Sequence, residues 1–220
     1  VVAGSPRLAQ HLQRLHPLVR MIEEAVDDKY FQVKPQAHRG TNIMFHGMHD
    51  NITYFEEIDG VLERLAKAFD FTVHFVIPPL DGTKKSNEAK VKQKPYPGQF
   101  HEWTMETLLE QMSLADIGLA PLFQQSWTWC KCANKLLSFS AASIPVVATD
   151  VPSYKAVAVN GRDAFLCFTE DDWFNALHTL LSDTKKRKQM SVNAKKMAGM
   201  MTLDKIAHEW LSFFEEIRPR

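Results

Sequence analysis

Short apolar runs alternate with longer amphipathic stretches along the chain. Residues 71–77, FTVHFVI, are β-branched and alternate in polarity, which is typical of a strand. Residues 52–69 space their apolar side chains three and four positions apart, which predicts one amphipathic helix. Residues 115–122, ADIGLAPL, are almost continuously apolar, as in a strand buried on both faces. Further strands are expected over 1–4, 18–22, 42–47, 99–103, 144–150 and 164–168.

Capping residues mark several expected helix starts. Ser5 followed by Pro6 predicts a helix that reaches about Arg14. Thr104 can cap a helix that reaches about Ser113. A capping-box spacing opens another helix at Thr169 to Asp172. Further helices are expected over 134–143, 151–159, 183–201 and 203–217, and residues 23–31 are expected to form a polar connector.

The apolar pattern stops between residues 78 and 97. This segment is rich in Pro, Gly, Ser and Lys. Its lysines are Lys84, Lys85, Lys90, Lys92 and Lys94. We expect a solvated, mobile loop, in preference to an anion-binding patch, because such charge runs usually face solvent.

Strands that alternate with helices of ten or more residues predict βαβ units. The fold class is therefore α/β, with a doubly wound, mainly parallel sheet and helices on both faces. Ligands of such sheets bind beyond the carboxyl ends of the strands, near the topological switch point. We expect a site in the loops that follow residues 42–46, 99–103, 115–122 and 144–150.

Composition and charge narrow the function classes. The chain has 220 residues, 45% apolar and 24% charged, with a formal net charge of zero. No global charge therefore draws it to nucleic acid or to a membrane. Its longest apolar runs, such as 141–148, are too short to span a bilayer. Residues 1–10 do not resemble a signal peptide, and the absence of an initial Met suggests a fragment of a longer chain.

The three cysteines do not predict a metal or disulfide site. Cys130 and Cys132, in WTWCKCANK, lack a second ligand pair, and Cys167 is isolated. His46 and His49 come nearest to a paired spacing. We therefore expect no metal, and small, partly buried thiols in a reducing cytoplasmic setting. The absence of Gly-x-Gly-x-x-Gly and Walker patterns disfavours dinucleotide and ATP enzymes.

Two lysines flank the start of the helix expected over 134–143. Lys131 lies just before this helix and Lys135 in its first turn. Lysine is unfavourable there unless a negative group compensates it, and a phosphate is the simplest such group. The alternative is two exposed lysines that face water. From these residues alone the two interpretations are evenly balanced.

Residues 114–122 and 127–154 together resemble the C-terminal, nucleotide-sugar-binding half of a GT-B glycosyltransferase of family four. Other pieces follow in the expected order. Residues 1–12 resemble the last strand and helix of the N-terminal half, 21–31 the hinge, 45–49 the first glycine loop, and 159–167 with 171–183 the closing strand and helix. The resemblance therefore covers nearly the whole chain.

The resemblance implies a division of the chain and a function. Residues 1–30 would be the tail of the N-terminal half and the hinge, 31–202 the Rossmann-like donor domain, and 203–220 a C-terminal crossover helix. The function would be transfer of a hexose from a nucleotide-diphosphate sugar, with retention, to a saccharide or lipid-linked acceptor in polysaccharide biosynthesis. The acceptor-binding half would lie outside this chain, which alone would not complete the transfer.

The resemblance also implies roles for particular residues. Lys131 and Lys135 would meet the diphosphate as the catalytic residues, so that no metal or other cofactor is expected. Gly47 would let the backbone approach the donor. The remaining residues that would bind the donor are His49 in the glycine loop, His101, Trp103 and Thr104 at the base, Pro121 and Leu122 at the ribose, Asn134 at the helix start, and Ser138 at the ribose hydroxyls.

The chain departs from the family pattern at two acidic positions. Family members usually carry two glutamates here, and Cys130 and Ser138 stand in their places. These losses support an alternative, a degenerate, non-catalytic GT-B-like binding or assembly domain. A weaker alternative is a sugar-nucleotide epimerase of GT-B shape.

Aromatic and basic residues outside the expected site have simpler explanations. Trp127 and Trp129 are expected to anchor the loop rather than to bind sugar. Residues 185–188 are expected to form a solvated helix face. Their alternative role is a membrane-surface patch, which would make the domain peripheral at the inner face of the membrane.

Overall fold

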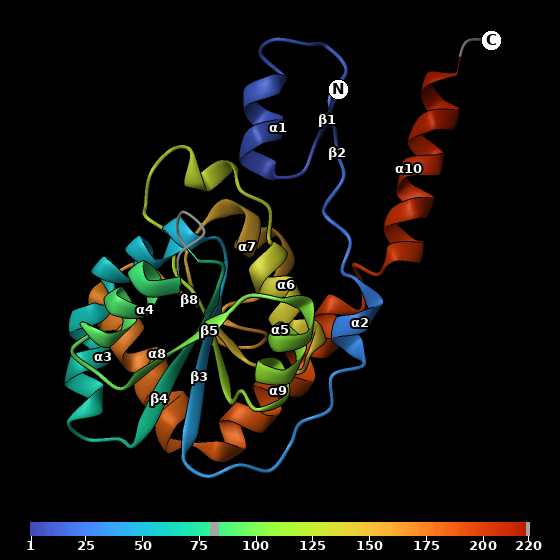
Figure 1. The fold of residues 1–220 in the computed structure, drawn as a ribbon. Coiled ribbons are helices and arrows are strands. Elements are labelled where there is room, and N and C mark those ends of the chain that lie inside the picture. Colours follow the sequence, from blue (N-terminus) through green and yellow to red (C-terminus); the bar gives the residue numbers. More distant parts are fainter. Residues whose placement is uncertain (80–83, 219–220) are drawn as a thin grey trace.

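A six-stranded parallel sheet forms the centre of the molecule. The computed structural model describes residues 1–79 and 84–218 (Figure 1). The strand order is β5-β4-β3-β6-β7-β8. Their bounds are β3 (Thr41–His46), β4 (Phe71–Ile77), β5 (Gly98–Glu102), β6 (Ile117–Ala120), β7 (Val146–Thr149) and β8 (Phe165–Cys167). The predicted α/β, doubly wound fold class is confirmed.

The chain changes direction within the sheet between β3 and β6. From β3 it builds outward to β4 and β5, and it then returns to place β6 on the other side of β3. Ile43 pairs with Ile117, and Met44 with Gly118, in the parallel register of these two strands. The β3–β6 junction is therefore the topological switch point, where a crevice opens beyond the carboxyl ends of the strands.

Helices cover both faces of the sheet (Figure 1). One face carries α3 (Asp59–Ala66), α4 (Lys84–Lys92) and α8 (Glu170–Ser182); the other carries α5 (Met105–Ser113), α6 (Asn134–Ala141), α7 (Pro152–Val157) and α9 (Thr184–Ala198). Alternate residues of a strand pack against the two helix layers. Phe45 packs with the first layer and Met44 with the second, because successive strand side chains point to opposite faces.

The two ends of the chain form a separate projection from this body. β1 (Val2–Ala3) pairs with β2 (Arg20–Met21), and α1 (Pro6–Leu12) lies between them in the sequence. A hinge segment containing α2 (Asp28–Phe31) leads to β3, and α10 (Leu203–Ile217) extends beside β1 and β2 (Figure 1). Ile22, Ile206 and Phe213 form a small apolar cluster between these parts. The proposed boundaries at 30/31 and 202/203 stay predictions.

The expected helix caps are present. The Ser5 hydroxyl accepts a hydrogen bond from the Leu8 amide at 3.4 Å, and that of Thr104 from the Thr107 amide at 3.0 Å. Thr169 and Asp172 form the reciprocal capping box at the start of α8. These short polar side chains satisfy amides that have no partner within their own helix.

The prediction of a single helix over 52–69 is wrong. A 3₁₀-helix, η1 (His49–Glu57), comes first, and α3 begins at Asp59 after Ile58 leaves helical geometry. The apolar residues Ile52, Phe55 and Ile58 are each three positions apart. Three residues per turn is the 3₁₀ period, so this spacing suits either helix type. Burial of all three in one core cluster favours the tighter helix here.

The prediction of a loop over 78–97 is also wrong for much of that segment. Residues 84–92 form α4, while residues 80–83 lie outside the described residues. Val91 packs beside Gly98, and the Asn87 side-chain amide donates to the Pro78 carbonyl at 2.8 Å. Lys94 forms an ion pair with Asp59 at 2.7 Å. Tertiary contacts thus stabilise a helix that has little apolar periodicity. The expected polar connector over 23–31 likewise contains the short helix α2.

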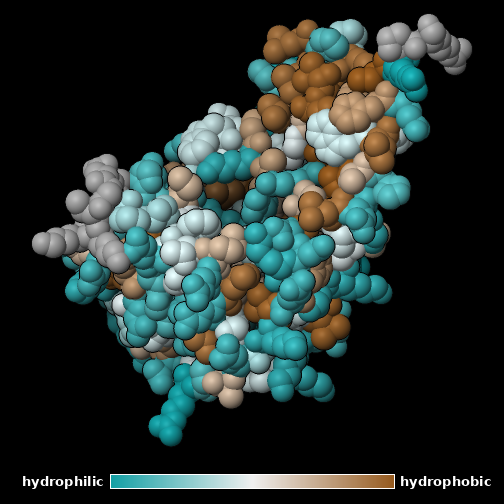
Figure 2. Space-filling model, turned by 45° about the vertical axis from the view of Figure 1, so that its right-hand side comes forward, coloured by the Kyte–Doolittle hydropathy of each residue, from teal (hydrophilic) through white to brown (hydrophobic). Residues whose placement is uncertain are grey.

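Apolar side chains remain exposed on the projection. Figure 2 shows them gathered over α10 and the β1–β2 segment. They are Leu15, Leu18, Met21, Leu203, Leu211, Phe214 and Ile217. Within the described part of the chain, no helix combines the length and apolarity that a bilayer span needs.

Candidate functional site

A cavity of about 720 Å³ opens at the switch point between β3 and β6. It is bounded by the hinge, the loop after β3, the start of α5, the loop after β6 and the start of α6. Its lining residues are Glu24, Tyr30, His46, Gly47, Met48, Asn51, Pro78, Trp103, Leu108, Leu122, Lys131, Cys132, Asn134, Lys135 and Tyr154. The loops after β3, β5 and β6 were expected to meet here.

Aromatic rings hold Lys131 at the cavity. The residue follows a short 3₁₀-helix, η2 (Thr128–Cys130), in the loop after β6. Its ammonium donates to the Tyr54 hydroxyl at 2.9 Å and lies 4.6 Å from the centre of the Trp127 ring. A cation over an aromatic face is attracted by the ring quadrupole. Trp127 therefore helps to hold Lys131 at the cavity, and its predicted role as a loop anchor stays a prediction.

Lys135 lies deeper, in the first turn of α6. Its ammonium is 5.2 Å from the centre of the Phe45 ring. Among the described residues, no carboxylate or other acceptor contacts this ammonium. Burial, and then the nearby charge of Lys131, lower the pKa of Lys135 from 10.5 to about 7. The site therefore holds two neighbouring lysines, and at pH 7 Lys135, which no carboxylate contacts among the described residues, is about half protonated.

The start of α6 adds a further positive end to this site. Ala133 is the N-cap and provides no side-chain hydrogen bond to the helix. The first amides of a helix carry partial positive charge and suit an anion. Together with Lys131 and Lys135, they make this side of the cavity suitable for a negatively charged group.

Gly47 lies where the end of β3 meets the Lys135 side chain. A Cβ atom at this position would lie 2.8 Å from Asn51 Nδ2 and 3.0 Å from Lys135 Cε. Only a residue without a side chain leaves this space free. The family resemblance predicted that Gly47 lets the backbone approach the donor, and this stays a prediction; the structure shows Asn51 and Lys135 beside this position.

Ser138 does not line this cavity but lines a smaller one, of about 180 Å³, which shares Glu24, Tyr30 and Asn134 with it. It is buried, and its hydroxyl donates to the Lys135 carbonyl at 3.1 Å and lies 3.0 Å from His46 Nε2. Burial, and then the charge of Lys135, lower the pKa of His46 to about 3, so this imidazole is neutral at pH 7. The hydroxyl expected to contact the ribose is thus occupied by His46, which itself lines the cavity.

The predicted site residues as a whole divide into two groups. Gly47, Trp103, Leu122, Lys131, Asn134 and Lys135 line the cavity; His49, His101, Thr104, Pro121 and Ser138 do not. His49 pairs with Asp50 at 3.0 Å, and His101 Nε2 lies 3.0 Å from His74 Nδ1. Local partners hold these histidines away from the crevice.

Sequence reasoning missed the contribution of the hinge to the cavity. Glu24 and Tyr30 line it, and Glu24 Oε1 accepts a hydrogen bond from Asn134 Nδ2 at 2.9 Å. Tyr154, which the sequence placed only within the helix expected over 151–159, also lines the cavity. Residues 21–31 were compared with a hinge, but their acidic side chains carried no signal of the contact with α6.

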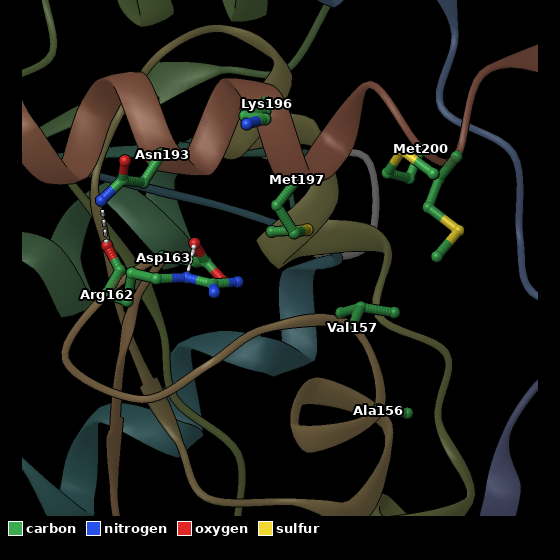
Figure 3. Close-up of a pocket in the computed structure, with 9 residues that line it drawn as sticks. Ala156, Val157, Arg162, Asp163, Asn193, Lys196, Met197 and Met200 are labelled. Carbon is green, nitrogen blue, oxygen red and sulfur yellow. Dashed lines mark hydrogen bonds and ion pairs between the residues drawn. The ribbon is translucent and has the colours of Figure 1, made fainter.

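A second cavity, of about 460 Å³, lies between α7 and α9 (Figure 3). The Arg162 guanidinium donates to both carboxylate oxygens of Asp163, at 2.9 and 2.8 Å. Asn193 donates to the Arg162 carbonyl at 3.2 Å, and Met197 and Met200 supply apolar walls. The charges of Arg162 and Asp163 satisfy each other, in contrast to the lysines at the switch point. We therefore assign the functional site to the first cavity.

Metal ligands are not clustered in the part of the chain that the structure describes. Within residues 1–79 and 84–218, no three His, Cys, Asp or Glu side chains lie close enough together to hold a metal ion.

The fold resembles that of several solved glycosyltransferases. A glycosyltransferase from Rickettsia africae ESF-5 matches with a TM-score of 0.79 and 16% identity, over 99% of this chain and 63% of its own. Anabaena Alr3699/HepE in complex with UDP and glucose matches with a TM-score of 0.79 and 13% identity, over the same shares of 99% and 63%. The C-terminal domain of the group 1 protein LpcC from Francisella tularensis has a TM-score of 0.54 and 18% identity, over 77% of this chain and 96% of that domain.

The chain spans less than two thirds of the Rickettsia and Anabaena proteins. No curated protein sequence matches it. At these identities the structural likeness establishes the fold, which is that of a GT-B glycosyltransferase. The family model described as Glycosyl transferases group 1 matches residues 40–183, which include both lysines and Gly47. The chain therefore belongs to the glycosyl transferases group 1 family.

Proposed function

We propose that the chain is the donor-binding half of a retaining glycosyltransferase. It would transfer a hexose from a nucleotide-diphosphate sugar to a saccharide or lipid-linked acceptor. One observation carries the proposal: the Lys135 ammonium lies in the switch-point cavity without an acidic partner among the described residues, beside Lys131. Two lysines at a helix start suit a diphosphate, and a bound anion would favour the charged form of Lys135.

The same groups would stabilise the leaving group. During transfer, the bond between the anomeric carbon and the diphosphate oxygen breaks, and its electron pair stays on that oxygen. The acceptor oxygen forms the new bond to the anomeric carbon, and its proton passes to the leaving diphosphate or to solvent. Lys131, Lys135 and the α6 amides would meet the developing negative charge of the diphosphate, so that no metal is needed.

Other cavity residues suit the rest of a nucleotide sugar. Trp103 is 40% exposed at the cavity, which leaves its indole available to stack on a base. Anabaena Alr3699/HepE has been solved with UDP and with UDP-glucose, and this supports a nucleotide sugar as the ligand here. We propose retention from the family resemblance alone, and the anomeric configuration of the product, measured by NMR, tests it.

The acceptor half would pack on the exposed apolar surface of α10 and β1–β2 (Figure 2). Exposed apolar side chains that gather on one surface are typical of an interface. We propose a cytoplasmic location. Lys185 and Lys188, exposed near the start of α9, would allow peripheral contact with an anionic inner membrane leaflet. Lys186 and Arg187, expected on the same solvated face, instead donate to the Gly161 and Leu180 carbonyls.

Isothermal titration against UDP-glucose, GDP-mannose and ADP-glucose tests donor binding. We expect the wild-type chain to bind one of them, and Lys131→Ala with Lys135→Ala to abolish that binding. A double change of two exposed lysines on α9, Lys185→Ala with Lys188→Ala, is the matched control and should retain it. Failure to bind any of the three, or binding unaffected by loss of Lys131 and Lys135, would refute the proposal.

A non-catalytic binding module is the second candidate. It is favoured by the absence of a carboxylate at both family positions, Cys130 and Ser138, and by the burial of Ser138 against His46. Assays of transfer and donor hydrolysis with the acceptor half present separate the two candidates. Donor binding without turnover would favour the module, whereas turnover would exclude it.

A further inference from the structure

The hinge places a carboxylate in the switch-point cavity. Among the lining residues that the structure describes, Glu24 is the only acidic one. It lies between β2 and α2, far in sequence from the loop that carries Lys131 and Lys135. The cavity therefore has a cationic side, formed by two lysines, and one anionic group.

The Glu24 carboxylate is oriented but has free hydrogen-bonding capacity. Its Oε1 accepts from Asn134 Nδ2 at 2.9 Å, and Asn134 is the first residue of α6. Within residues 1–79 and 84–218, no cation is paired with this carboxylate. An ionised carboxylate has about four acceptor sites, so most of them remain available to a ligand.

The neighbouring residue fixes this part of the hinge. Glu23 is buried, and burial raises the pKa of its carboxyl group. Its Oε1 accepts a hydrogen bond from the Glu24 amide at 3.2 Å. Glu23 therefore fixes the hinge backbone beside Glu24, whose own side chain is exposed and is oriented by its hydrogen bond to Asn134.

Neither family position supplies a carboxylate here, because Cys130 and Ser138 stand there, and Ser138 lines a smaller cavity together with Glu24 and Asn134. Cys130 does not line the cavity, and its Sγ lies 3.5 Å from the Ser126 carbonyl. The Ser5 hydroxyl donates to its backbone carbonyl at 2.7 Å. The side chain at this position thus contributes neither charge nor a strong acceptor to a bound donor.

We propose that Glu24 binds hydroxyl groups of the donor and so supplies, from the hinge, a carboxylate that this chain lacks at position 130. The inference rests on the proposed function. A carboxylate accepts hydrogen bonds from adjacent hydroxyls strongly, but it repels a phosphate. The diphosphate would therefore lie toward Lys131 and Lys135, and a neutral, hydroxyl-rich part of the donor, either the ribose or the transferred sugar, would lie at Glu24.

Glu24→Gln tests this role because it removes the charge and preserves the size. The matched control is Asp28→Asn, at an exposed hinge carboxylate that does not line the cavity. Titration uses the nucleotide sugar that wild type binds most tightly among UDP-glucose, GDP-mannose and ADP-glucose, then its nucleoside diphosphate, then pyrophosphate. Glu24→Gln should weaken nucleotide-sugar binding about tenfold, as for loss of a charged hydrogen bond. Pyrophosphate, which has no hydroxyl groups on carbon, should bind no more weakly than to wild type.

The outcomes separate the inference from the function on which it rests. If Glu24→Gln also weakens binding of the nucleoside diphosphate, Glu24 contacts the ribose. If it weakens binding of the nucleotide sugar alone, Glu24 contacts the transferred sugar. If Glu24→Gln binds the nucleotide sugar within twofold of wild type, the role of Glu24 is overturned while the proposed function stands. If wild type binds none of the three nucleotide sugars, both fall together.

Discussion

Donor affinity should depend on pH through the charge of Lys135. With a pKa of about 7, Lys135 is roughly nine-tenths protonated at pH 6 and roughly one-tenth protonated at pH 8. A bound diphosphate favours the ammonium form and should restore its charge. The apparent Kd should therefore rise about tenfold from pH 6 to pH 8, which corresponds to ~1.4 kcal/mol.

Isothermal titration across this pH range measures the effect. UDP-glucose is a suitable probe, provided that wild type binds it, because its diphosphate does not titrate between pH 6 and 8. Repeating the titration at pH 8 in buffers of different ionisation enthalpy counts the protons taken up. We expect close to one proton for each donor bound, because the site must recharge a single lysine.

The charged and titratable neighbours define the controls. His46 stays neutral throughout, since its pKa is about 3, and Lys131 contacts the Tyr54 hydroxyl. Lys135→Arg should flatten the pH profile because arginine remains charged. A flat wild-type profile with no proton uptake, or an equally steep profile in Lys135→Arg, would refute the reasoning.

Three further predictions concern the site and its support. Gly47→Ala should weaken donor binding at least severalfold and change Tm little, because the new Cβ would meet the mobile end of Lys135 at 3.0 Å; titration and thermal melts separate the two effects, and unchanged binding would contradict this. Gly118→Ala should cost about 1–3 kcal/mol, since its Cβ would meet the buried Phe139 ring at 2.7 Å, and urea unfolding that shows no loss would refute it. His46 has its pKa lowered from 6.5 to about 3, so the unfolded chain binds more protons and stability falls as pH drops below 6.5. The loss from this residue is about 2 kcal/mol at pH 5, and urea unfolding of wild type and His46→Gln at pH 7 and 5 should show a smaller loss in the variant.

Local patterns in the sequence were sufficient for most of the fold. The capping box at Thr169 and the apolar run 115–122 each depend on neighbouring residues, and both lie where they were expected. Local patterns failed where packing between distant segments decides the structure. Residues 84–92 have weak apolar periodicity, yet they form α4 because Val91 and Asn87 are buried.

The site shows the same division. The sequence alone placed Lys131 and Lys135 at a helix start after a buried parallel strand, because strand, loop and helix are consecutive. Whether these lysines face water or a cavity depended on Gly47 and the hinge, which are distant in sequence. Three features of the site arise only when these segments meet. They are the lowered pKa of Lys135, the buried hydroxyl of Ser138 and the position of Glu24 at the cavity. Desolvation and partner choice are properties of that three-dimensional neighbourhood, and a one-dimensional pattern does not contain them.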